Sequence, residues 1–153
     1  MRIMGTAFST LVLAAALGGG AAAHEPADAI RDRRALMKLQ GAAAGAIKLA
    51  IDSKDATRLK QVEGAARALT FSSRAIPTMF PKGSDSKAGE TKALDKIWTD
   101  TAGFKKAADN MGSLAAALAD ALKEGDGAKS MAAFAALGKD GCGGCHGTYQ
   151  RQQ

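Results

Sequence analysis

The residues best suited to chemistry lie in one short stretch near the end of the sequence. Cys142 and Cys145 are the two cysteines of the chain, and His146 directly follows the second. Two cysteines separated by two residues and followed by a histidine form the attachment signal for a c-type haem. Each thiol then forms a thioether with the porphyrin, and the imidazole becomes an axial ligand of the iron. The sequence therefore predicts one haem c, covalently held by Cys142 and Cys145, with His146 as metal ligand.

Two other chemistries also use closely spaced cysteines. A structural zinc site takes four ligands, and the only histidine outside the motif is His24. A thioredoxin-like dithiol needs strands beside it, and the sequence indicates none. On a helix, residues three and four apart share a face, so one helical face would present Cys142, Cys145 and His146 together. We therefore expect haem attachment.

The rest of the chain must supply the elements that enclose this group. Hydrophobic residues make up 46% of the sequence and aromatic residues only 5%, and the apolar residues are mostly Ala and Leu, which favour helices over strands. We expect helices over residues 25–51, 53–75 and 91–122, and from 128 into the haem motif, with a loop over 72–90. Four helices joined by two short turns and one long loop predict an all-α antiparallel four-helix bundle with the haem between facing helices.

Apolar spacing predicts which helical faces are buried. In the first helix, Ile30, Met37, Ala44 and Ile51 recur every seven residues, which is typical of a bundle seam. The third helix has spacings of three and four throughout, and the fourth has three apolar positions that we expect to point inward. These positions are Leu94, Ile97, Thr101, Phe104, Ala108, Met111, Ala115, Leu118 and Leu122 in the third helix, and Met131, Phe134 and Leu137 in the fourth.

The first 23 residues have the features of a secretory signal peptide. Arg2 is followed by an apolar stretch over 3–17, and Ala21 to Ala23 provide small residues for cleavage. This stretch is too short for a permanent membrane span, so we expect cleavage after Ala23 and a mature domain over 24–153. Because c-type haem is attached outside the bacterial cytoplasm, we predict a soluble periplasmic protein.

The distribution of charged residues indicates which kinds of partner the protein binds. The formal net charge is +6 at pH 7, but the basic residues are scattered among acids, which favours a solvated surface over a docking patch. We expect no nucleic-acid partner. The scattered residues are Lys48, Lys54, Arg58, Lys60, Lys82, Lys87, Lys105, Lys106 and Lys123.

Several stretches resemble one known family. A haem motif near the end of a four-helix chain is similar to the cytochrome c′ family, the class II c-type cytochromes. The resemblance covers nearly the whole mature chain. It rests on residues 33–38, on 80–84, on Ile97-Trp98 followed by Phe104, and on 142–149.

The resemblance implies two candidate functions, which differ in what lies at the iron on the face of the haem away from the histidine ligand. In high-spin members an apolar residue covers an empty iron site that admits small gases, whereas in a low-spin branch a methionine occupies it. Met37, four residues after Arg33, matches the low-spin branch, although core packing is the usual role of a buried methionine. Met79 is a less suitable candidate, since it lies in the expected loop.

We therefore expect a low-spin monohaem electron carrier that exchanges electrons with redox partner proteins and is not an enzyme. The iron ligands would be His146 and Met37. The alternative is a five-coordinate haem protein that binds nitric oxide or carbon monoxide. The sequence leaves open whether the chain is a monomer or a homodimer.

Three further residues have possible roles. Arg33 matches a family position near the haem, where a guanidinium would pair with a haem propionate, but a solvated charge is an equally good interpretation. Arg151 lies one position beyond the place where the family carries a basic residue, which is Gln150 here. His24 would begin the mature chain, where an imidazole can chelate copper, but a single histidine is weak support.

Overall fold

The computed structural model describes residues 25–152. The expected signal peptide, its cleavage point after Ala23, and His24 lie outside the described residues. Within them the chain forms helices and no strand, apart from one isolated antiparallel bridge between Ala93 and Gln150. The helices are α1 Pro26–Asp52, α2 Ala56–Gln61, α3 Glu63–Ala75, η1 Ile76–Met79, α4 Lys96–Thr99, α5 Thr101–Glu124, α6 Gly127–Ala136, η2 Leu137–Gly143 and α7 Gly144–Tyr149.

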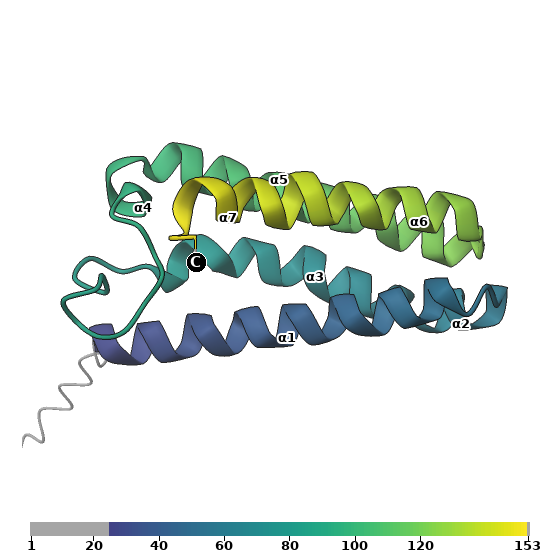
Figure 1. Ribbon diagram of the computed structural model, residues 1–153, viewed down its shortest axis with the longest axis horizontal. Coiled ribbons are helices and arrows are strands. Elements are labelled where there is room, and N and C mark those ends of the chain that lie inside the picture. The colour runs from purple at the N-terminus through teal and green to yellow at the C-terminus, as the bar shows by residue number, and fades with distance from the viewer. Residues whose placement is uncertain (1–24, 153) are drawn as a thin grey trace, which may run out of the picture.

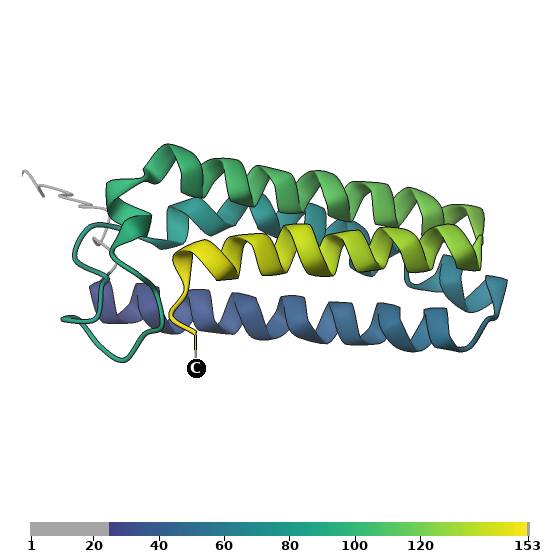
Figure 2. The same ribbon diagram turned by 45° about the horizontal axis from the view of Figure 1, so that its top comes forward.

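These segments make four antiparallel rods, which confirms the predicted four-helix bundle. The rods are α1, α2 with α3, α5, and the continuous α6–η2–α7 helix, and Figure 1 shows them running back and forth along one long axis. The connection between η1 and α4 lies at the end of the bundle where α1 begins. The carboxyl end of α7 reaches the same end, beside α1 (Figure 2).

Aspartates determine where several helices begin. The side chains of Asp55, Asp100 and Asp126 accept hydrogen bonds from the first backbone amides of α2, α5 and α6, which is the preferred way to cap a helix N-terminus. Gly125 ends α5 with φ of 74°, a left-handed conformation that glycine adopts at little cost.

The third predicted helix is wrong in its first part. It begins at Lys96 rather than at residue 91, and Asp100, with φ −125° and ψ 59°, separates the short α4 from α5. The break occurs because the Asp100 side chain accepts a hydrogen bond from the Gly103 amide at 3.0 Å and restarts the helix there. As a result Leu94 precedes the helix and is exposed, although the spacing of three and four residues placed it in the buried face of the third helix.

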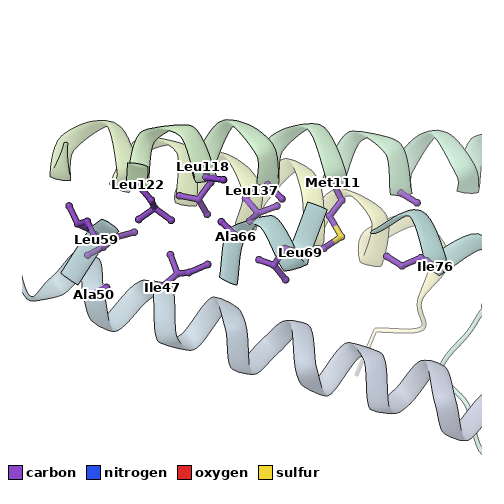
Figure 3. Packing of buried hydrophobic residues seen from close by; sticks show 14 of the residues in the cluster. Ile47, Ala50, Leu59, Ala66, Leu69, Ile76, Met111, Leu118, Leu122 and Leu137 are labelled. Atoms are coloured by element: carbon purple, nitrogen blue, oxygen red, sulfur yellow. The ribbon is translucent and has the colours of Figure 1, made fainter. Parts of the chain in front are cut away.

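The core lies along the axis of the bundle. Figure 3 shows Leu59, Leu118 and Leu122 converging from the second and third rods, with Ile47 facing them from α1. The prediction that Met131 points inward is wrong, since this side chain is 42% exposed. The buried stripe of the last rod runs instead through Ser130, Leu137 and Gly141, and a hydrophobicity pattern does not select a serine for such a position.

The closest approach of α3 and α5 depends on a glycine. A Cβ atom on the buried Gly112 of α5 would overlap the hydroxyl of Ser73, which is itself buried and donates to the carbonyl of Thr70 at 2.8 Å. The next nearest atoms to such a Cβ are at ordinary contact distances of 3.5 Å or more. The Ser73 hydroxyl is thus the only steric obstacle in this contact.

We predict that Gly112→Ala destabilises the protein by about 1–3 kcal/mol, the usual cost of overpacking a core. The double variant Ser73→Ala/Gly112→Ala removes the obstacle, so its free energy of unfolding should lie within about 1 kcal/mol of that of Ser73→Ala alone. Denaturant unfolding followed by far-UV circular dichroism measures all four proteins. Additive losses in the double variant would contradict the proposed contact.

A second contact anchors the end of α7. The Tyr149 hydroxyl donates to Asp100 Oδ2 at 2.8 Å, and the backbone amides of Leu94 and Arg151 donate to the carbonyls of Tyr149 and Lys92. The Tyr149 hydrogen bond, assisted by the Gly103 amide and by the charge of Lys96, lowers the pKa of the Asp100 carboxyl. The carboxylate form of Asp100 therefore holds the carboxyl end of the last rod against the start of α5.

The hydrogen bond between Tyr149 and Asp100 should make the stability of the folded protein depend on pH in the acid range. Because the pKa of Asp100 is lower in the folded state than in the unfolded one, its stabilisation is complete above the unfolded value of about 3.9 and is lost as pH falls through the folded value. Tyr149→Phe removes the main cause of the shift, so its thermal midpoint should fall less between neutral pH and acid than that of the wild type. Parallel slopes for the two proteins would refute this role of Tyr149.

Candidate haem site

A cavity of about 720 Å³ opens between α1, α5, the η2–α7 segment and residues 90–93. This volume falls within the roughly 300–1,000 Å³ that is typical of cofactor and ligand pockets. Its lining is largely apolar. The charged side chains in the lining come from α1, from residues 90–92 and from Arg151. The apolar lining includes Ala44, Leu69, Ile76, Phe80, Ile97, Phe104, Met111, Phe134, Leu137 and Tyr149.

One wall carries the predicted attachment motif. Cys142 lies at the end of η2, Cys145 and His146 lie in α7, and all three line the cavity. Both thiols are free and half-buried, and burial raises their pKa. His146 stays accessible, but partial desolvation lowers the pKa of its imidazole. The two thiols are therefore protonated at neutral pH and the imidazole is neutral, which leaves a nitrogen lone pair for a metal.

The segment η2, which ends with the first cysteine of the motif and Gly143, winds as a π-helix rather than an α-helix. A π turn is wider than an α turn and occurs frequently at functional sites. A Cβ atom on Gly141 would lie 3.0 Å from Leu137 and 3.5 Å from the backbone of Met111, so η2 packs closely on α5 at this point. The sequence analysis missed this feature, for which the glycines at 138, 141, 143 and 144 were the available signal.

The α1 wall carries Met37, Gly41 and Ala44, spaced by four and three residues. Met37 is half-buried and lines the cavity. Apart from its chain neighbours and the backbone of its own helix, no atom of the described residues comes within 4 Å of the position that a Cβ on Gly41 would take. The α1 face is thus open beside Met37, as a flat ring requires. Of the other methionines, Met79 does not line the cavity, and Met111 lines it from α5, where its backbone lies against Gly141.

Arg33 is buried at the edge of the cavity, so the interpretation of this residue as a solvated charge is wrong. Its side chain is 4% exposed. The guanidinium donates to Ser84 Oγ and O and to Thr91 Oγ1 at 2.8–2.9 Å, and it stacks on the Phe80 ring at 4.5 Å. Within the described residues no ion pair joins it to a carboxylate, and desolvation lowers its pKa. A buried cation beside the cavity suits an anionic group of a cofactor.

Aromatic side chains close the end of the cavity. Phe104 makes edge contacts with both Phe80 and Tyr149, at ring-centroid distances of 4.9 and 5.1 Å. Trp98 lies behind Phe80 and donates its indole N–H to the carbonyls of Phe80 and Pro81 at 3.1 Å. Phe80 and Tyr149 were matched only as parts of longer motifs, and the sequence did not indicate that they line the cavity.

The residues present fit a haem better than a bare metal ion. Within residues 25–152 no group of three or more His, Cys, Asp or Glu side chains converges as metal ligands do. Cys142, Cys145 and His146 instead occupy one wall of a wide apolar cavity. Two thiols and one imidazole on such a wall suit two thioether bonds and one axial ligand of a planar cofactor.

Comparisons with known proteins agree with this interpretation. The family model described as Cytochrome C' matches residues 28–150. Cytochrome c-556 from Agrobacterium tumefaciens is 30% identical over 79% of this chain and 95% of its own length. Cytochrome c' from Rubrivivax gelatinosus is 39% identical over a shorter stretch, which covers 49% of this chain and 57% of the relative.

Solved structures agree in fold and in family. The cytochrome c' of Rubrivivax gelatinosus has a TM-score of 0.70 and 30% identity, with 83% of this chain and 98% of that chain covered. The nitric oxide complex of the L16A mutant of cytochrome c prime from Alcaligenes xylosoxidans has a TM-score of 0.71 and 25% identity, covering 84% and 98%. None of the helices in the described part of this chain is long and apolar enough to cross a membrane. The matching family model and the shared bundle show that this chain belongs to the cytochrome c′ family.

Proposed function

We propose that this c-type cytochrome is an electron carrier whose haem iron is ligated by His146 and Met37. The family binds one covalently attached haem c, and residues 142–146 fit its attachment motif. The observation that carries the proposal is the place of Met37, which lines the cavity from α1 while the motif lines it from η2 and α7. The haem supplies a one-electron couple, and ligation by Met and His raises its potential.

The proposal gives a role to each of the five candidate site residues. Cys142 and Cys145 hold the cofactor to the last rod, and the neutral imidazole of His146 binds the metal. The flexible thioether of Met37 would bind the iron from α1. An iron held by both residues leaves no position for a substrate, and so we assign no catalytic residue. Arg33 holds a positive charge for a propionate, since its hydrogen bonds to Ser84 and Thr91 fix the guanidinium at the cavity edge.

A second candidate is a five-coordinate haem protein that binds a small gas. Among the structural relatives are nitric oxide complexes of the Alcaligenes xylosoxidans protein, and taken alone they favour this alternative. The two functions share the attachment motif and differ only in whether Met37 binds the iron. For either function we propose export to the bacterial periplasm, with removal of residues 1–23.

Met37→Ala separates the two candidates. If Met37 is a ligand, the wild type has a low-spin absorption spectrum when reduced, and the variant changes to a high-spin spectrum because one strong-field ligand is lost. Met79→Leu is the matched control, since Met79 does not line the cavity, and its spectrum should equal that of the wild type. A Met37→Ala spectrum identical to that of the wild type would remove Met37 as a ligand, and a change in Met79→Leu alone would assign the role to Met79.

We also propose that the protein pairs with a second copy of itself through an apolar face on α1 and α3. Leu39, Leu49 and Phe71 are 68%, 72% and 66% exposed, and such exposure marks interaction surfaces. The exposed residues of α1 continue the pattern at spacings of four and three, namely Ala35, Leu39, Ala42, Ala46 and Leu49.

The two parts of this face adjoin each other. Gln40 donates to Ser72 Oγ at 2.9 Å across the contact between α1 and α3, and Leu39 and Phe71 directly precede these two residues. An interface between identical copies needs one self-complementary patch, and alternating small and large residues at heptad spacing allow two helices to pack closely.

Leu39→Glu/Phe71→Glu should convert a dimer into a monomer, because it places charges at the centre of the apolar face. Light scattering after size exclusion should give twice the mass of one chain for the wild type and for the control Lys123→Glu, whose exposed side chain lies on α5. A monomeric mass for the wild type at tens of micromolar would overturn the pairing.

A further inference from the structure

Four exposed cations surround the cavity that holds the haem motif. Arg34 and Lys38 lie on α1, Lys92 lies in the connection before α4, and Arg151 lies in the tail after α7, and we call these four residues the basic rim. All four line the cavity and are exposed, and among residues 25–152 Glu90 is the only acid that lines it. The sequence alone does not reveal this grouping, because the four residues come from three distant segments.

The rim charges are not neutralised by neighbouring acids. Some cations elsewhere do form ion pairs, as in Lys48–Asp52 and Lys105–Asp109 at 2.6 Å, and what distinguishes the rim is that four cations gather around one cavity. Within residues 25–152 no ion pair involves any of the four rim residues. The rim therefore carries positive charge that the described protein does not neutralise by contact.

The backbone also places two of these basic residues opposite each other. The antiparallel bridge between Ala93 and Gln150, with the Arg151 amide donating to the Lys92 carbonyl at 2.8 Å, places Lys92 and Arg151 directly opposite. Like charges opposite each other across a strand pair are destabilising. The Arg151 side chain is held further by its hydrogen bond to the Thr91 carbonyl at 3.2 Å. The fold thus keeps two basic residues at opposing backbone positions beside the cavity.

We infer that the basic rim is the docking surface for a protein that presents Asp and Glu side chains around its own redox centre. The inference rests on the proposed electron carrier and adds the chemistry of its partner. An acidic partner is favoured over a lipid surface because electron exchange needs a second redox centre close to the haem, which a bilayer lacks. Complementary charge mainly raises the rate of encounter.

Small redox reagents of opposite charge test the sign of the rim. The reduced holoprotein gives one electron to ferricyanide, a trianion, or to tris(1,10-phenanthroline)cobalt(III), a trication. Raising ionic strength from about 10 to about 150 mM shortens the screening length from roughly 30 to roughly 8 Å. The second-order rate should fall with ferricyanide and rise with the cobalt complex. Equal or reversed dependences, as would follow if the haem propionates neutralise the rim, would overturn the inference.

Matched charge reversals locate the effect. Lys38→Glu/Lys92→Glu and the control Lys106→Glu/Lys123→Glu change the net charge equally, but the control side chains are exposed on α5 and do not line the cavity. At low ionic strength the rim variant should react with ferricyanide roughly three- to tenfold more slowly than the control. Equal rates for the two variants would show that only net charge matters, and this would contradict a local docking surface.

Direct binding distinguishes the kind of partner. A hexaglutamate peptide titrated into labelled wild-type holoprotein should shift the backbone amide signals of Lys38, Lys92 and Arg151, and the rim variant should lose these shifts. Binding to vesicles with anionic phospholipid that needs the rim, without any response to the peptide, would replace the acidic protein by a membrane. The absorption spectrum of each sample reports iron ligation separately, so a failure of the Met37 assignment is distinguishable from a failure of the docking surface.

Discussion

Burial of the Arg33 charge is the constraint on which the rest of the site depends. The guanidinium is enclosed between α1, the ring of Phe80 and the connection that carries Ser84 and Thr91. A buried cation is costly unless its donors are satisfied, so residues 84–91 must lie against α1. The same connection continues into residues 92–94, which pair with the chain end around Tyr149. A continuous set of contacts therefore links the α1 wall, which carries Met37, to the α7 wall, which carries His146.

Further contacts within this linkage enclose one end of the cavity. Tyr149 is tied to Asp100 and packs on Phe104, which in turn packs on Phe80 beneath Arg33. Toward the other end, leucines and alanines from all four rods form an ordinary bundle core (Figure 3). These polar contacts cluster at the end of the bundle that carries the long connection between η1 and α4. Elsewhere the apolar core holds the four rods together.

The sequence predicted those parts that depend on local spacing. The haem motif and the extent of α1 each follow from a few neighbouring residues, and the resemblance supplied the family. Other features needed the fold. The restart of the helix at Asp100 depends on its side-chain hydrogen bond, the burial of Ser130 depends on how α6 packs, and the π turn of η2 depends on its contact with α5. The basic rim was hidden for the same reason, since Lys92 and Arg151 become neighbours only when the tail pairs with the connection. The site roles of Met37 and Arg33 remain proposals that rest on their positions at the cavity.

The central claim is that Met37 of α1 would serve, together with His146, as a ligand of the haem iron. The most direct measurement is the absorption spectrum of the reduced wild-type protein at neutral pH before and after addition of carbon monoxide. With Met37 bound, the spectrum is low-spin and carbon monoxide leaves it unchanged, because a thioether already fills the site that the gas would need. A high-spin reduced spectrum that shifts on addition of carbon monoxide would contradict the claim and make the protein a five-coordinate binder of small gases.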